Sequence, residues 1–153
     1  MDNPSAALNQ FLSKVFPDIL REEERMLSRD KPDLSIREFH LIDAVCQAVD
    51  SGQGNRATDI AAAQHVTAGT LTTSVSMLER KGYLERRRDP RDRRVVRIFP
   101  TEQGRAANER HTRLRQELVD HILAALPGDE AAALARMLKK VTAFFNGALP
   151  EQA

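Results

Sequence analysis

The sequence has a single cysteine, Cys46, in 153 residues. An intramolecular disulfide is therefore excluded, and a reducing compartment is expected. No run approaches the roughly 18 apolar residues of a membrane-spanning helix, and the N-terminus lacks the apolar core of a signal peptide. Glycine and proline, seven of each, fall mainly at the ends of predicted elements. We expect a cytoplasmic protein with no membrane partner.

The sequence patterns of catalysis are absent as well. We recognise no nucleophile with a neighbouring base, no glycine-rich phosphate loop and no set of metal ligands, so we expect neither an enzyme nor a cofactor. The histidines have no metal-ligand spacing with a cysteine or a carboxylate cluster; they are His40, His65, His111 and His121. Cys46 lies near the core face of its predicted helix with no cation beside it in sequence. This favours a buried, inert thiol over a redox sensor.

Charge is distributed unevenly along the chain. The net charge is +1, but residues 79–97 hold nine Lys or Arg against four acids, a local charge of +5. The remainder holds 14 bases and 18 acids, a net charge of −4. A cationic patch on an acidic body indicates an oriented polyanionic partner rather than general adhesion.

Residues 68–81 are predicted to form a helix with two different faces. Leu71, Val75 and Leu78 recur at i, i+4 and i+7, which places them on one buried face. Thr67 suits the N-cap, and Gly82 suits the left-handed residue that ends a helix. The opposite face is short or polar apart from one arginine; it carries Gly69, Thr72, Thr73, Ser76 and Arg80. A face so small allows close approach to another surface.

An arginine-rich hairpin is predicted to follow this helix. Residues 83–88 and 94–99 are expected to be strands joined by a turn at Asp89, with Arg97 pointing outward from the second strand. Six arginines fall within nine residues of this hairpin: Arg86, Arg87, Arg88, Arg91, Arg93 and Arg94. A solvated turn would account for an ordinary charge run. Six arginines beside a polar-faced helix favour contact with DNA instead.

The segments before this helix complete a helix-turn-helix. Residues 4–29 have helical apolar spacing that Pro17 interrupts, so a kink or two shorter helices is expected. Ser35 and Glu38 have the form of a capping box that opens the next helix. A short helix at 57–64, together with the polar-faced helix, then forms the helix-turn-helix.

Both ends of the chain are predicted to be amphipathic helices. Thr101 caps a helix that runs to about Leu126, and another follows the breaker Pro127-Gly128-Asp129. Apolar stripes on the terminal helices comprise Leu8, Phe11, Leu12, Val15, Phe16, Ile19, Leu20, Leu114, Leu118, Ile122, Leu134, Leu138, Val141 and Phe145. One small winged domain cannot cover all of them, so we expect them to pack against a second copy of the chain.

The fold class that follows is mainly α (α+β). We expect a winged helix-turn-helix domain with a two-stranded wing at residues 34–100. It is flanked by N- and C-terminal helices, residues 1–33 and 101–153, that form an intertwined helical dimerisation region.

Two motifs follow the predicted helix in a fixed order within LERKGYLERRRDPRDRRVVRIFPTEQG. They are D-x-R at Asp92 and Arg94 and T-x-x-G at Thr101 and Gly104. With the order of elements, they resemble the MarR family of bacterial winged helix-turn-helix transcriptional regulators, over nearly the full chain. Pro100 departs from the leucine that the family usually has there, and it is expected to end the second strand. EFHLID and TLTTSVSMLERKGYL also resemble the branch that represses fatty-acid synthesis and senses acyl chains.

The resemblance implies a homodimer that places one recognition helix per subunit in successive major grooves of a pseudo-palindromic operator, with wing arginines in the flanking minor grooves. Arg94 would enter the minor groove and Asp92 would orient it. The DNA-binding residues that we predict are Thr67, Thr70, Thr72, Thr73, Ser76, Arg86, Arg88, Arg91, Arg93 and Arg94.

The resemblance further implies a repressor released by a small, largely apolar effector. Phe11, Phe16, Phe39 and Ile42 are the candidate lining of an effector pocket, and ordinary core packing is the alternative role for these four side chains. An alternative function for the whole chain is a winged-helix protein-interaction module that does not bind DNA. Such a module has no need of a polyarginine wing tip.

Overall fold

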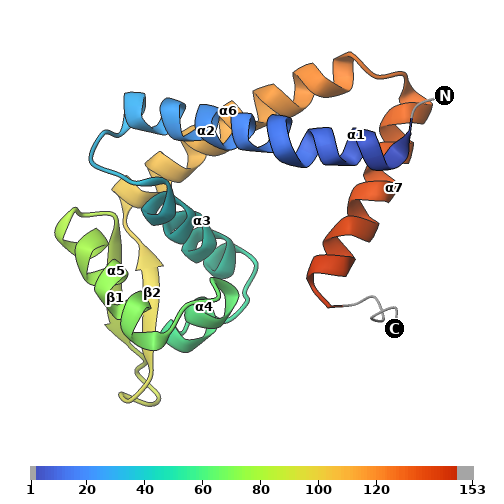
Figure 1. Ribbon diagram of the computed structural model, residues 1–153. Helices are drawn as coiled ribbons and strands as arrows, with labels where there is room; N and C mark the ends of the chain where they lie inside the picture. Colours follow the sequence, from blue (N-terminus) through green and yellow to red (C-terminus); the bar gives the residue numbers. More distant parts are fainter. Residues whose placement is uncertain (1–2, 148–153) are drawn as a thin grey trace. The chain divides into compact units, whose positions relative to one another are not determined.

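A computed structural model describes residues 3–147 as helices joined by one two-stranded sheet, which confirms the predicted fold class (Figure 1). The chain divides into two compact units, Met1–His111 and Thr112–Ala153. Among the described residues, no helix is long and apolar enough to cross a membrane. The predicted division into a DNA-binding domain and a dimerisation region concerns the assembled dimer and stays a prediction. The outermost residues of the predicted dimerisation region, 1–2 and 148–153, lie outside the described residues.

The N-terminal helical segment is interrupted where Pro17 was expected to disturb it. α1 (Pro4–Gln10) leads into a π-helical turn, η1 (Phe11–Val15), and then into α2 (Phe16–Asp30). The Phe16 N–H bonds to the Phe11 carbonyl, five residues back, instead of the usual four. Proline has no N–H and its ring crowds the preceding turn, so a widened turn just before it relieves both problems.

Three helices form the body of the winged domain, and the first and third begin at the predicted caps Ser35 and Thr67. The helices are α3 (Ile36–Asp50), α4 (Ala57–Ala63) and α5 (Ala68–Arg80). Ser35 Oγ accepts from the Glu38 N–H at 3.2 Å, and Thr67 Oγ1 accepts from the Thr70 N–H at 3.1 Å. α5 ends one residue before the predicted Lys81. Gly82 follows with a φ of +86°, the left-handed conformation that glycine adopts without a Cβ clash.

The wing is an antiparallel pair, β1 (Leu84–Arg88) and β2 (Val96–Pro100), in which Arg88 pairs with Val96. The prediction that the second strand starts at Arg94 was wrong. The Val95 N–H bonds to the Asp92 carbonyl at 2.9 Å, and this turn keeps residues 92–95 out of the ladder. β2 ends at Pro100, as expected.

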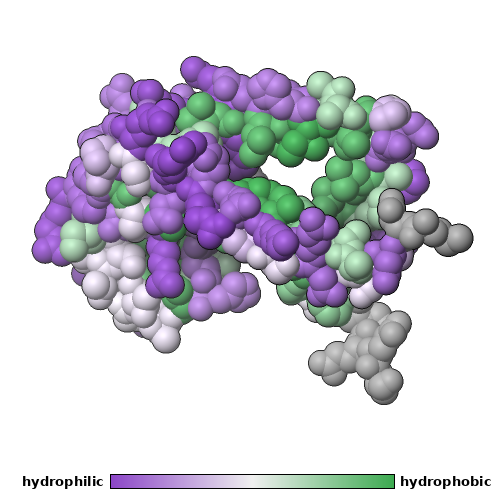
Figure 2. Space-filling view, turned by 45° about the horizontal axis from the view of Figure 1, so that its top comes forward, coloured by the Kyte–Doolittle hydropathy of each residue, from purple (hydrophilic) through white to green (hydrophobic). Residues whose placement is uncertain are grey.

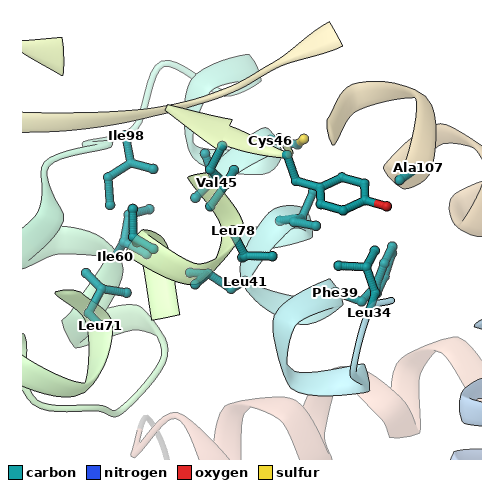
Figure 3. Packing of buried hydrophobic residues seen from close by; sticks show 14 of the residues in the cluster. Leu34, Phe39, Leu41, Val45, Cys46, Ile60, Leu71, Leu78, Ile98 and Ala107 are labelled. Atoms are coloured by element: carbon teal, nitrogen blue, oxygen red, sulfur yellow. The ribbon is translucent and has the colours of Figure 1, made fainter. Parts of the chain in front are cut away.

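The core lies between α3, α4, α5 and the base of the wing (Figure 3). α3 contributes Phe39, Ile42 and Val45, each with 0% exposure. The predicted face of α5 is confirmed as buried, since Leu71, Val75 and Leu78 are 0–3% exposed. Ile60 from α4 and Ile98 from β2 close the cluster. Cys46 is buried in the same core, and this burial raises the pKa of its thiol to about 11.

The T-x-x-G motif forms a tight junction between the wing and α6 (Glu102–Ala124). The Thr101 hydroxyl donates to the Gly82 carbonyl at 2.6 Å and accepts from the Gly104 N–H at 3.1 Å. A Cβ on Gly104 would lie 2.1 Å from the Tyr83 carbonyl oxygen, so only glycine fits this approach. The Thr101 N–H bonds to that same carbonyl at 3.1 Å. The motif thus fixes where α6 leaves the sheet.

The second unit consists of the remainder of α6 and α7 (Gly128–Phe145). α6 ends at Ala124, two residues before the predicted Leu126, because the next two N–H groups bond to carbonyls only three residues back. α7 has an amphipathic sequence but buries none of its residues. Its exposed large apolar side chains are Met137, Leu138, Val141, Phe144 and Phe145.

The first unit likewise leaves an apolar stripe exposed on its N-terminal helices. Seven side chains of this stripe are between 37% and 56% exposed: Leu8, Phe11, Leu12, Val15, Phe16, Ile19 and Leu20. Figure 2 shows bands of apolar side chains at the surface of the molecule. In a folded protein, contiguous apolar surface of this extent marks an interaction site.

Candidate nucleic-acid interface

The outer face of α5 presents a row of small hydroxyl side chains. Thr67, Thr70, Thr72 and Thr73 are exposed, and Ser76 is partly exposed. The buried leucine and valine face fixes the helix from behind, so these side chains face outward as the sequence indicated. Their hydroxyl groups carry donors and acceptors of the kind that contact phosphates and base edges.

Two of these hydroxyls are already oriented by local hydrogen bonds. The Thr67 hydroxyl donates to Thr70 Oγ1 at 3.0 Å, and the Thr73 hydroxyl donates to the Gly69 carbonyl at 3.1 Å. A Cβ built on Gly69 would meet no atom of the described chain within 4 Å. Since no internal contact requires glycine there, the open space suits the close approach of an external surface.

The wing tip is a turn that two aspartates organise. Asp89 Oδ1 accepts from the Arg91 N–H at 2.8 Å, and Asp92 Oδ1 accepts from the Arg94 N–H at 3.1 Å. Asp92 Oδ1 also accepts from Nε of Arg94 at 3.2 Å. The Arg94 side chain is nevertheless 92% exposed. A turn, and not the strand expected to start at Arg94, brings the two residues together and leaves the guanidinium projecting into solvent.

The other wing arginines separate into two groups. Arg88, Arg91 and Arg93 are exposed, and Arg88 Nη1 donates to the Arg93 carbonyl at 2.8 Å, which braces the tip. Arg87 instead lies over the Phe99 ring, 4.6 Å from its centroid, and pairs with Glu85. Cation–π stacking of this kind holds Arg87 on the strand and away from the tip.

A polar network at the base of the wing was not predicted. We expected Arg97 to point outward, but its Nε donates to Asp89 at 2.8 Å and its Nη1 donates to Asn55 Oδ1 at 3.0 Å. Asn55 is buried and donates to the Ile98 carbonyl at 2.9 Å. Hydrogen bonds from the Arg91 N–H and from Arg97 hold the pKa of Asp89 below its ordinary value. The network anchors the tip to the loop before α4.

Arg86 lies in a different place from the one expected of a DNA contact. Its guanidinium is folded against α5, where it bonds to the Thr72 carbonyl and Ser76 Oγ and pairs with Glu79. Only 29% of its side chain is exposed. No sequence signal marks this contact, because it joins a strand to the outer face of a helix.

The four candidate effector-pocket residues are divided between core and surface. Phe39 and Ile42 are fully buried in the core, whereas Phe11 and Phe16 are 43% and 45% exposed, with ring centroids 6.4 Å apart. A single chain therefore does not bring the four around one cavity. A cavity of about 590 Å³ lies instead between α3 and α5. Its lining comprises Ser35, Arg37, Glu38, His40, Leu41, Gln64, Val66, Thr70, Leu71 and Ser74.

The MarR family model matches residues 48–96, which span the end of α3, all of α4, α5 and β1, and the wing tip up to the first residue of β2. The crystal structure of Streptococcus pneumoniae FabT in complex with DNA has a TM-score of 0.86 and 32% sequence identity to this chain. The alignment covers 95% of this chain and 99% of FabT.

Curated relatives match over the central part of the chain. They include the uncharacterized HTH-type transcriptional regulator YwhA of Bacillus subtilis, 33% identical over 76 residues, which are 50% of this chain and 55% of YwhA. The multiple antibiotic resistance protein MarR of Salmonella typhimurium is 38% identical over 77 residues, 50% of this chain and 54% of the relative. The chain spans about half the length of these curated relatives. Together with the full-length likeness to FabT, the matches show that this chain belongs to the MarR family of winged helix-turn-helix transcriptional regulators.

Proposed function

We propose that this cytoplasmic protein is a homodimeric regulator that binds a pseudo-palindromic DNA operator and represses transcription until a small, largely apolar effector releases it. The observation that carries the proposal is the pairing of two surfaces in one unit. The outer face of α5 is small and rich in hydroxyls, and the neighbouring wing tip carries exposed arginines. The first surface suits the floor of a major groove, and the second suits the narrower, more negative minor groove beside it.

The charge distribution supports a phosphate-rich partner. The local +5 of residues 79–97 lies on α5, the wing and its tip, while the remainder of the chain has a net charge of −4. Such an arrangement orients the molecule as it approaches DNA and disfavours binding through its other faces. A protein-interaction module does not need a cationic patch to orient it toward a polyanion, so the alternative function leaves the arginine tip unexplained.

The exposed apolar stripes support a homodimer. α1, η1 and α7 bury none of their residues, although together they carry many large apolar side chains. A second copy of the chain offers the same stripes for a self-complementary interface. Two-fold symmetry would then set the two recognition helices about 10 base pairs apart on one side of the duplex. Deleting residues 1–29, or ending the chain at Leu126, is expected to abolish tight operator binding.

The proposed effector is a lipid-like or phenolic molecule that binds near the dimerisation helices. The exposed Phe11 of η1 and Phe16 of α2 supply apolar surface, and the resemblance to acyl-chain sensors suggests the same ligand chemistry. Binding would favour a dimer in which the recognition helices no longer match successive grooves. If a ligand screen finds no small molecule that changes DNA affinity, the protein is a regulator without such an effector.

The test begins with genome-wide footprinting of the bound DNA, which supplies the operator. The dissociation constant for that duplex is then measured by fluorescence anisotropy at several salt concentrations, with a scrambled duplex as control. We expect the logarithm of the association constant to fall linearly with the logarithm of salt, by about 0.9 per phosphate neutralised. The absence of measurable binding to either duplex at low salt would leave the protein-interaction module as the better function.

A further inference from the structure

Arg86 connects the first strand of the wing to the outer face of the recognition helix. Its Nη2 donates to the Thr72 carbonyl at 2.7 Å and to Ser76 Oγ at 3.0 Å. Its Nη1 pairs with the Glu79 carboxylate, which also accepts from the Arg86 N–H at 3.2 Å. One residue of β1 is therefore bonded to α5 through both its side chain and its main chain.

The three partners of Arg86 form a single stripe along α5. Thr72, Ser76 and Glu79 follow at i, i+4 and i+7, so they lie one above another on the helix surface. One of the acceptors is the Thr72 main-chain carbonyl, which cannot move without the helix. A guanidinium offers several N–H groups in a fixed plane, and this geometry suits simultaneous contact with such a stripe. The contact resists rotation of α5 about its own axis relative to the wing.

We propose that Arg86 is a positioning residue that fixes the rotation of α5 against the wing, and that it does not itself contact DNA. This inference rests on the proposed function of DNA binding. Rotation of α5 decides which hydroxyls face the major groove, and β1 leads directly to the wing tip. By holding α5 against β1, Arg86 positions the recognition helix and the wing tip for adjacent grooves before the protein binds DNA.

Arg86 also determines the hydrogen-bonding role of Ser76. The guanidinium occupies one acceptor position of the Ser76 oxygen, so the hydroxyl hydrogen is the group of Ser76 that we expect to contact a partner outside the chain. Ser76 is thereby presented as a donor, which suits the acceptors of the major groove, such as guanine N7 and O6 or thymine O4.

The exposed wing arginines are arranged differently. Arg93 and Arg94 are exposed, whereas Arg86 keeps 29% of its side chain exposed and shares its charge with Glu79. To reach a phosphate, Arg86 would have to leave the Glu79 carboxylate, the serine oxygen and the main-chain carbonyl together. Its charge is already neutralised where it lies, so it adds little to counterion release.

The test compares Glu79→Ala with Glu85→Ala, because both remove one negative charge from the same region. Glu79 is the partner of Arg86, whereas Glu85 pairs with Arg87 on the strand. We expect Glu79→Ala to weaken operator binding about 10-fold or more, since it removes the ion pair that holds Arg86 against α5. Glu85→Ala is expected to leave operator binding unchanged or slightly tighter on all duplexes. If Glu79→Ala tightens binding as Glu85→Ala does, the freed Arg86 contacts DNA and the inference is wrong.

A second pair of variants separates positioning from charge. Arg86→Lys keeps the charge but lacks the planar set of donors, so we expect it to bind the operator as weakly as Arg86→Ala, at an unchanged salt slope. Arg93→Ala serves as the control for a direct phosphate contact and should reduce the slope by about 0.9. An Arg86→Lys protein with wild-type affinity, or an Arg86→Ala protein with the reduced slope of Arg93→Ala, would overturn the inference.

Thermal unfolding followed by circular dichroism accompanies each titration. If Arg86→Ala does not fold at the assay temperature, Glu79→Ala and Arg86→Lys decide the matter. Glu79→Ala places a strong helix former in α5, and Arg86→Lys keeps a long side chain on β1. Failure of the wild-type protein to bind any duplex would reject the proposed function itself. Wild-type binding with tight Glu79→Ala binding would reject only the role of Arg86.

Discussion

The recognition helix and the wing are held in place by different kinds of interaction. α5 is fixed from behind by Leu71, Val75 and Leu78, which are almost completely buried. The wing tip has no comparable apolar support; it is held by ion pairs and hydrogen bonds of Asp89 and Arg97 with the main chain and with Asn55. Apolar burial does not depend on charge and so responds little to pH or to screening by salt, whereas ion pairs respond to both.

This difference suits the tasks that we propose for the two elements. Base recognition in the major groove needs a helix whose position is fixed, because hydrogen bonds depend on distances and angles. Insertion into a minor groove of variable width is better served by a tip whose side chains are oriented but exposed. The comparison also leads to experiments in which the two elements should respond differently.

The largest expected effect is on the apolar support of α5. Leu78→Ala removes a completely buried side chain and should lower the free energy of unfolding by about 2–5 kcal/mol. Urea denaturation followed by circular dichroism measures it. Arg87→Ala on the wing should change the same free energy by less than about 1 kcal/mol, because exposed ion pairs contribute little. Equal effects of the two substitutions would contradict the distinction between the two elements.

The next effect concerns DNA affinity rather than stability. Arg94→Ala should weaken operator binding by about 1–3 kcal/mol, mostly on operators with narrow, A·T-rich flanks. Arg87→Ala, held over Phe99, should cost less, act on all sequences alike and change the salt slope by at most about one. Titrations against A·T-rich and G·C-rich flanks provide the measurement. Indistinguishable behaviour of Arg87→Ala and Arg94→Ala would show that the tip does not enter the groove.

Asp92→Ala tests whether orientation of the tip matters. Asp92 holds both the main chain and Nε of Arg94, so its removal should weaken operator binding. Coulomb's law alone predicts tighter operator binding, because a negative charge near DNA is lost. The same titrations decide between the two, and tighter binding by Asp92→Ala would mean that the carboxylate does not pre-orient the arginine.

A smaller effect is expected on the open face of α5. Gly69→Ala should raise the free energy of unfolding by roughly 0.5 kcal/mol, because alanine is the better helix former and the added Cβ meets no atom within 4 Å. The same methyl group should weaken operator binding if DNA approaches that face closely. Urea denaturation and operator titration give the two values. A variant that gains both stability and affinity would show that Gly69 faces away from the DNA.

The smallest effect is the pH response of the wing. The pKa of Asp89 is lowered in the folded protein, chiefly by the Arg91 N–H and then by Arg97. The contribution of Asp89 to stability is therefore present above the carboxyl's ordinary pKa and is lost as pH falls through the lowered value. An NMR titration of the Asp89 carboxyl should show this low midpoint, and Arg97→Gln should raise it. A midpoint at the ordinary value in the wild-type protein would exclude the network in solution.

The sequence predicted the parts of the fold that depend on local chemistry. The caps at Ser35 and Thr67, the left-handed Gly82 and the buried face of α5 follow from spacing and from side-chain hydrogen bonding within a few residues. The terminal turn of α6 and the start of β2 at Val96 were misplaced by two residues each. Both errors arose where short-range turns compete with regular structure.

The contacts that the sequence did not predict join residues that are distant in the chain. Arg97 alternates with apolar neighbours as an outward residue would, yet it binds Asn55, 42 positions away. Arg86 belongs to a run of arginines that are otherwise exposed, and only the packing of β1 beside α5 brings its guanidinium to Thr72 and Ser76. Local patterns therefore do not show which arginine of such a run folds back onto the protein's own backbone.

The burial of Cys46 has a consequence under oxidative stress. Peroxides react with the thiolate, and a pKa of about 11 leaves roughly one molecule in ten thousand in that form at pH 7. The side chain is also 2% exposed, so an oxidant must wait for the core to open. We expect DNA affinity to stay constant after peroxide treatment, and alkylation of Cys46 to report the opening of the core around α3.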